Sequence, residues 1–100
     1  MIDFLKRVNI SDSTLIEMMK NNNEAILFNL SCNEDDALKI INYMQSIGIN
    51  DIDDLLIYRI DIFTILFEQF IKKISKFNIP LLVEYVNSDY TNIDIINNSY

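Results

Sequence analysis

Carboxylates form the most prominent groups of reactive side chains in this sequence. The runs Glu34-Asp35-Asp36 and Asp51-Ile52-Asp53-Asp54 each follow an Asn and precede an apolar stretch. Such runs can bind a divalent cation or supply general acids. A calcium loop of the EF-hand type beginning at Asp51 needs Gly in sixth place and Glu in twelfth, where Leu56 and Ile62 stand. Both runs instead predict the first turn of a helix, where carboxylates interact favourably with the helix dipole.

The residues that most catalytic sites require are missing. The chain has no His, which excludes Ser-His-Asp and Cys-His catalysis, His-ligated zinc and the commonest general base. Cys32 has no basic cluster beside it in the sequence and is interpreted as a small core or boundary residue, not as a nucleophile. One Gly excludes a Gly-rich phosphate loop. We therefore predict that the protein is not an enzyme and uses no cofactor and no metal.

Length and charge narrow the class of protein further. One hundred residues with 50% hydrophobic content predict a single domain over 1–100. The net charge of −7 disfavours direct binding to nucleic acid or to an anionic membrane, because such binders gather Lys and Arg. It is compatible with a basic protein partner and with solubility alone. A single Cys, no apolar leader and no apolar run of membrane-spanning length predict a cytoplasmic protein.

The local patterns predict an all-α fold. One Gly and one Pro are too few for the turns of a β-rich chain. Apolar residues recur at spacings of three and four, and Ser11, Asn33 and Asn50 stand where N-caps belong. Gly48 is the expected left-handed residue after a helix, and Thr91 with Asp94 resembles a capping box. Helices are expected over 2–8, 12–20, 25–30, 34–47, 51–60, 61–76 and 80–86, with a last turn at 95–96.

The helix expected over 61–76 has the widest apolar face. Such a face predicts a helix packed on two sides, and we expect it to be the central one. The cluster of Lys72, Lys73 and Lys76 suits the C-terminal end of this helix, where the dipole favours cations.

The punctuation between helices recurs along the chain. Residues 8–12 match residues 47–51, which lie 39 positions later, and a weaker copy starts at Phe77. Periods of this length in a helical chain indicate stacked helical hairpins. The prediction is a short stack of hairpins, right- or left-handed, of six to eight helices, with possible repeats 8–46, 47–76 and 77–100.

Segment 43–63 resembles one repeat of the mitochondrial transcription termination factor family. Gly48, the pair Leu55-Leu56 and Arg59 match the family pattern in place, whereas Ile60 stands where the family has Pro. The resemblance implies a helical-repeat shape. Members of that family wrap double-stranded nucleic acid with a basic concave face. This chain has the opposite charge, so the shape is carried over and DNA binding is not.

The leading functional hypothesis is a non-enzymatic protein-interaction module that binds another protein or a second copy of itself. The residues predicted to contact a partner are Asp51, Asp53, Asp54, Tyr58, Arg59 and Tyr85, with Tyr90 and Tyr100 as further amphipathic side chains. One alternative is an acidic decoy or regulator that binds a nucleic-acid-binding protein, as inhibitors carried by mobile elements do. A second alternative is a nucleic-acid-binding helical repeat.

Overall fold

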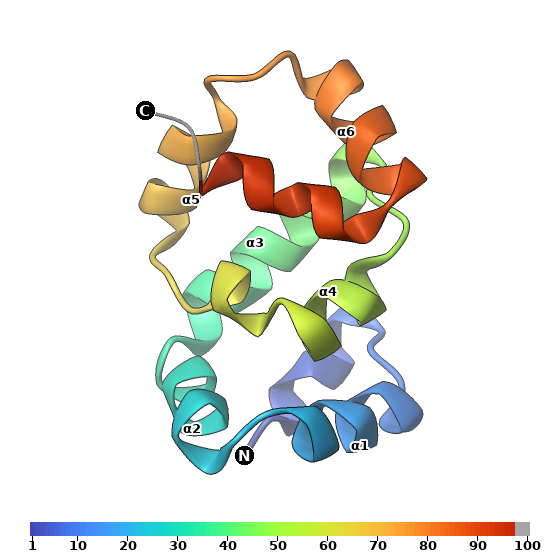
Figure 1. Ribbon diagram of the computed structural model, residues 1–100. Coiled ribbons are helices and arrows are strands. Elements are labelled where there is room, and N and C mark those ends of the chain that lie inside the picture. The colour runs from blue at the N-terminus through green and yellow to red at the C-terminus, as the bar shows by residue number, and fades with distance from the viewer. Residues whose placement is uncertain (98–100) are drawn as a thin grey trace.

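The computed structural model describes residues 1–97, which fold into helices joined by short connections (Figure 1). The α-helices are α1 (Asp12–Asn21), α2 (Glu24–Cys32), α3 (Glu34–Ile47), α4 (Ile52–Tyr58), α5 (Phe67–Ile74) and α6 (Ile79–Ser88). Three 3-10 helices complete them, η1 (Asp3–Val8), η2 (Ile60–Phe63) and η3 (Tyr90–Ile96). The prediction of an all-α stack is confirmed.

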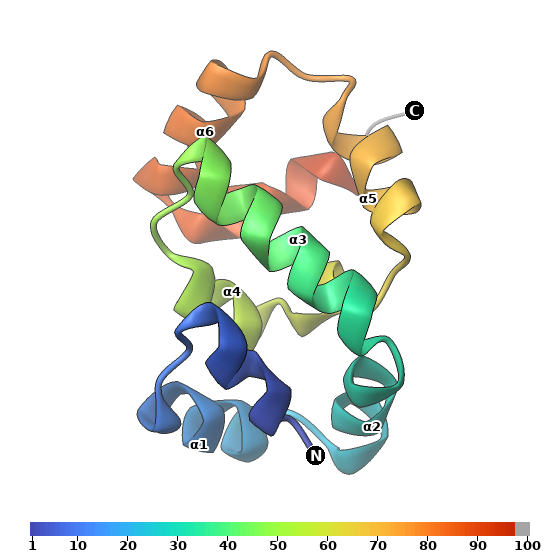
Figure 2. The ribbon, with the colours of Figure 1, turned by 180° about the vertical axis from the view of Figure 1, so that it is seen from behind.

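The central element is α3. It is the longest helix, with 14 residues, and it contacts η1, α2, α4, α5, α6 and η2. Figure 2 shows it crossing the molecule diagonally from α2 to α6. Its buried side chains recur at helical spacing and are Ala37, Ile40, Ile41 and Met44. A helix of this length is marginal alone in water, so the packing of its buried side against these neighbours is what stabilises it.

The prediction of one central helix over 61–76 is wrong. The segment divides into η2 and α5, and Leu66 between them is extended, with φ −66° and ψ 144°. The carboxylate of Asp36, on α3, accepts the N–H of Phe67 at 2.9 Å and so caps α5 from another element. The apolar face expected over 61–76 was wide because the segment holds two helices, each with its own buried side. Phe63 of η2 and Phe70 of α5 are both fully buried.

The two turns that the sequence pattern aligns have the same backbone geometry. Asn9 and Gly48 both adopt left-handed conformations, with φ 67° and 97°. The next residue in each turn, Ile10 or Ile49, is buried and donates its N–H five residues back, to Leu5 or to Met44. This is the bonding of a Schellman turn. At the third aligned turn Asn78 has φ −70°, so the geometry is shared by two turns, and the complete repeat stays a prediction.

Amide side chains fasten each of these two turns to a later helix. The Gln45 side chain, on α3, donates to the carbonyl of Val8 at 3.1 Å. The Asn87 side chain, on α6, donates to the Gly48 carbonyl and accepts the Asn50 N–H, both at 2.9 Å. These bonds set the order of the stack: α3 on the turn after η1, and α6 on the turn after α3.

Two helix starts follow the prediction, with one addition. Ser11 accepts the N–H of Thr14, as an N-cap does. Pro80 lies in the first turn of α6. Asn23 was not predicted to cap a helix, but its side chain accepts the N–H of Ile26 and caps α2.

Other caps differ from the prediction. Asn33 is at the N-cap of α3, but its side chain donates back to the carbonyl of Asn29. The N-cap of α4 is Asp51 instead of Asn50, whose N–H is bound to Asn87. The expected capping box of Thr91 and Asp94 is replaced by Asp89, which accepts the Thr91 N–H at 3.0 Å.

Replacing Gly48 with Ala should destabilise the fold. A Cβ at Gly48 would meet Val83 at 3.8 Å, an ordinary contact, so the cost comes from φ +97° and not from a clash. We expect the free energy of unfolding in urea to fall by about 1–2 kcal/mol. Asn9→Gly is the matched control, because Gly is relaxed at φ 67°. Equal stability of Gly48→Ala and the native chain would contradict this account.

Asn87→Ala should loosen α6 from the α3–α4 turn. The change removes one donor and one acceptor, and we expect about 1–3 kcal/mol of lost unfolding free energy. Hydrogen exchange at the Asn50 amide, which loses the Asn87 side-chain oxygen as its acceptor, is the specific measurement. Asn92→Ala is the control, because that side chain bonds the Tyr85 carbonyl within the same hairpin. Unchanged protection at Asn50 would disprove the clamp.

Candidate protein-interaction groove

Apolar side chains lie on the outward face of α6 as well as on its inward face. Leu82 and Val86 are buried against the core, whereas Leu81 is 64% and Tyr85 47% exposed. The Asn78 carboxamide accepts the Leu81 N–H at 3.1 Å and fixes where the helix begins. Leu81 and Tyr85 are one turn apart, so their side chains form a ridge along the helix. An exposed apolar pair of this kind is more informative than a single exposed Leu.

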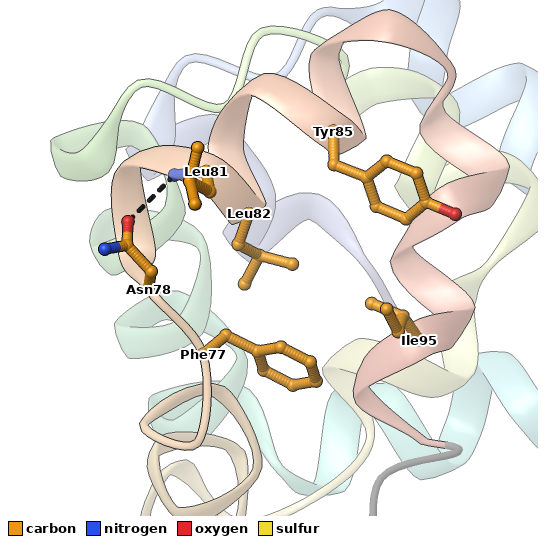
Figure 3. A pocket seen from close by; sticks show the side chains of 6 residues that line it. All are labelled: Phe77, Asn78, Leu81, Leu82, Tyr85 and Ile95. Atoms are coloured by element: carbon orange, nitrogen blue, oxygen red, sulfur yellow. Dashed lines mark hydrogen bonds between the residues drawn. The ribbon is translucent and has the colours of Figure 1, made fainter.

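A cavity of about 390 Å³ lies on one side of this ridge, between α6, η3 and the connection from α5. Figure 3 shows Phe77, Leu82 and Ile95 pointing towards one another across it. The residues that line it are Phe77, Asn78, Leu81, Leu82, Tyr85 and Ile95. The volume is in the range of small ligand pockets. An apolar side chain from another molecule is the group that such walls accept.

A second hollow of about 330 Å³ lies against the same ridge and has polar edges. It is lined by Leu81, Glu84, Tyr85 and Ser88. The two hollows share Leu81 and Tyr85, and we call the whole surface the α6 groove. No catalytic arrangement accompanies it: apart from Glu84 and the Tyr85 hydroxyl, its side chains are not titratable.

The wall formed by η3 is held in place by α4. The rings of Tyr58 and Tyr90 stack with centroids 5.9 Å apart and planes at 25°. Next to them the Arg59 guanidinium Nε lies 3.1 Å from a carboxylate oxygen of Asp94. Stacked aromatic pairs contribute about 0.5–1.5 kcal/mol beyond their buried area. Tyr58 and Arg59, predicted to contact a partner, therefore contact η3 of their own chain.

The predicted contact residues come from α4 with its ends and from α6. Asp51, Asp53 and Asp54 lie in or just before the first turn of α4, and no hydrogen bond or ion pair joins their side chains to other residues within 1–97. Tyr85 alone belongs to the α6 groove. The structure thus places five of these residues in or next to α4, where Asp54 and Tyr58 are one turn apart, and Tyr85 on α6; Tyr100 lies outside the described residues.

The residues predicted to contact a partner do not include Leu81, Phe77 and Ile95. The helix expected over 80–86 includes Leu81, but the pattern did not show which of its apolar residues face outward, and Phe77 lies just after the helix expected over 61–76. A signal was present: α6 has apolar residues at four of the positions 81–86, which is wider than one-sided packing can bury. Ile95 is reached by the groove only because η3 folds back on α6.

Asp89 places a fixed negative charge at the end of α6. Its carboxylate accepts the hydroxyl of Thr91 at 2.8 Å and the Thr91 N–H at 3.0 Å. The hydroxyl bond, followed by the backbone bond, lowers the pKa of Asp89 from its ordinary 3.8. The carboxylate is therefore ionised at neutral pH.

Another hollow, at the start of α3, lacks the features of a site. It is lined by Cys32 and residues 33–36. Cys32 is exposed, so its assignment to the core or boundary is wrong. Glu34 is paired with Arg7 at 2.9 Å, and Asp36 is bound to the Phe67 amide. No set of three His, Cys, Asp or Glu side chains within 1–97 is arranged to hold a metal ion, and none of the helices in that range is long and apolar enough to cross a membrane.

The Thr91–Asp89 bond should make part of the stability depend on pH. Because the pKa of Asp89 is lowered in the folded state, its contribution is complete above the unfolded-state pKa and is lost as the pH falls through the folded-state pKa. Thr91→Val, which removes the hydroxyl donor, should be less stable than the native chain at neutral pH and equal to it in strong acid. Thr91→Ser keeps the hydroxyl and is the control. Urea unfolding across acidic pH measures the difference, and a gap that persists in strong acid would contradict this origin.

Comparison with models of known protein families, with curated protein sequences and with solved structures finds no significant match. The resemblance of segment 43–63 to mitochondrial transcription termination factors therefore stays a prediction. The break after α4 does occur at Arg59, although Ile60 replaces the family's Pro.

Proposed function

We propose that this protein is a non-enzymatic protein-interaction module whose α6 groove receives an apolar segment of a partner. The observation that carries the proposal is the apolar cavity beside Leu81, the most exposed large hydrophobic side chain of the described residues. Cavities of this kind, next to an exposed apolar ridge, mark surfaces at which proteins bind one another.

The energy available from the groove supports reversible binding. Full burial of a large apolar side chain is worth about 1.5–3 kcal/mol, and Leu81 and Tyr85 start from large exposed fractions. Association costs several kcal/mol in lost freedom before any affinity appears. One or two partner side chains in the cavity therefore give a modest affinity that other contacts around the groove would raise.

The acidic decoy is the weaker alternative because the carboxylate runs are far apart. Glu34–Asp36 begins α3 and Asp51–Asp54 follows its end. A 14-residue helix is about 21 Å long at ~1.5 Å per residue, so the two runs do not present one acidic face. Direct nucleic-acid binding is disfavoured by the charge of −7. The proposal includes two further predictions, which are that the hairpins are repeats and that the protein is cytoplasmic.

Photo-crosslinking from single positions tests the proposal. A benzophenone amino acid at Leu81 should give a defined adduct in the cells that express the protein, whereas the same group at Phe28, 61% exposed on α2, should not. Tyr85→Asp in the Leu81 derivative should abolish the adduct without unfolding the chain, because Tyr85 is half exposed. Equal crosslinking from both positions, or none from Leu81, would refute the groove as the binding surface.

A further inference from the structure

The helical walls of the α6 groove carry only negatively charged side chains. Residues 79–96, which span α6 and η3, contain Glu84, Asp89 and Asp94 but no Lys or Arg. Asp94 is neutralised by Arg59. Asp89 stays ionised because of Thr91, and Glu84 is exposed and makes no ion pair within the described chain. Two carboxylates therefore remain uncompensated, one lining the groove and one at its end.

The lysines that precede α6 in the chain lie outside the groove. Lys76 precedes Phe77 in the connection from α5 and is exposed, and Lys73 donates to the side chain of Asn97 just after η3. A molecule lying along α6 meets negative charge on the α6 side and positive charge only beyond Phe77.

The ridge of the groove has helical spacing. Leu81 and Tyr85 are one turn apart, with a hollow on each side. A partner helix that lies along α6 presents its own apolar residues at the same interval, so one row of them fits into the apolar cavity beside the ridge. An extended strand would need unpaired backbone groups on this face, which a helix does not offer.

A second copy of the chain fits this surface less well. Each copy carries a charge of −7, and an α6-to-α6 contact would bring Glu84 and Asp89 of both copies to one interface without a cation from either helix. Like charges juxtaposed at an interface cost free energy. A cationic partner would gain free energy from the same carboxylates that repel a second copy.

From these observations we infer that the occupant of the α6 groove is a cationic amphipathic helix, with apolar anchors at i and i+4 and Lys or Arg on the side that faces Glu84. The inference rests on the proposed function and specifies its partner. The charge pattern fixes the orientation of the polar face, and the apolar anchors supply the affinity. Raised salt should weaken the charged component and leave the apolar one.

Selection from a displayed library of short helical peptides, with randomised surface positions, tests the inference. Against the native protein, enriched peptides should share Leu, Phe or Met at i and i+4 and Lys or Arg on one flank. Against Glu84→Lys the flank should change to Asp or Glu, and a peptide selected by the native chain should bind Glu84→Lys about tenfold more weakly, which is about 1.4 kcal/mol. Glu24→Lys, a reversal in the first turn of α2, is the control and should change neither result.

The outcomes separate the inference from the proposed function. Apolar peptides whose binding needs Leu81 but whose flanking charge is random would overturn the cationic helix and leave the groove as a binding surface. Failure of Leu81→Asp to reduce the binding of any selected peptide would overturn both. Sedimentation showing a dimer that Leu81→Asp dissociates would replace the cationic helix by a second copy of the chain.

Discussion

The whole structure depends on the packing of α3 against elements that are too short to be stable alone. Its neighbours range from the four residues of η2 to the ten of α6, and helices of that length do not persist in water without tertiary contacts. Each of them buries its apolar side on α3 or on a helix that packs on α3. The free energy of folding is therefore shared among many small contacts, and loss of α3 would remove the common partner of all of them.

Two local features could be recognised from the sequence because they depend on residues that are close together in the chain. Ser11 and Thr14 are three residues apart, and Gly48 needs only its own lack of a Cβ, so cap and turn could be recognised from the sequence. The division of 61–76 could not, because the group that fixes it is Asp36, 31 residues earlier. Helical periodicity also continues across the break, since η2 and α5 each turn an apolar side inward.

The candidate site shows the same limit. Tyr85 was identified as an amphipathic residue from its type, but Tyr58 and Arg59 have the same character and are used to bind η3. Residue type alone does not distinguish a side chain that awaits a partner from one that already has an intramolecular one. The groove arises from three segments, the 75–78 connection, α6 and η3, and its existence depends on how η3 folds back after Asp89.

Cys32, the sole thiol of the chain, is exposed at the end of α2, while α6 lies at the other end of the molecule (Figures 1 and 2). A fluorophore attached there reports tumbling and distance without touching the groove. The same thiol allows two copies to join through a disulfide when air oxidises the sample. Covalent pairs of that kind have nothing to do with the surface at α6, and a reducing agent distinguishes them at once from a true complex.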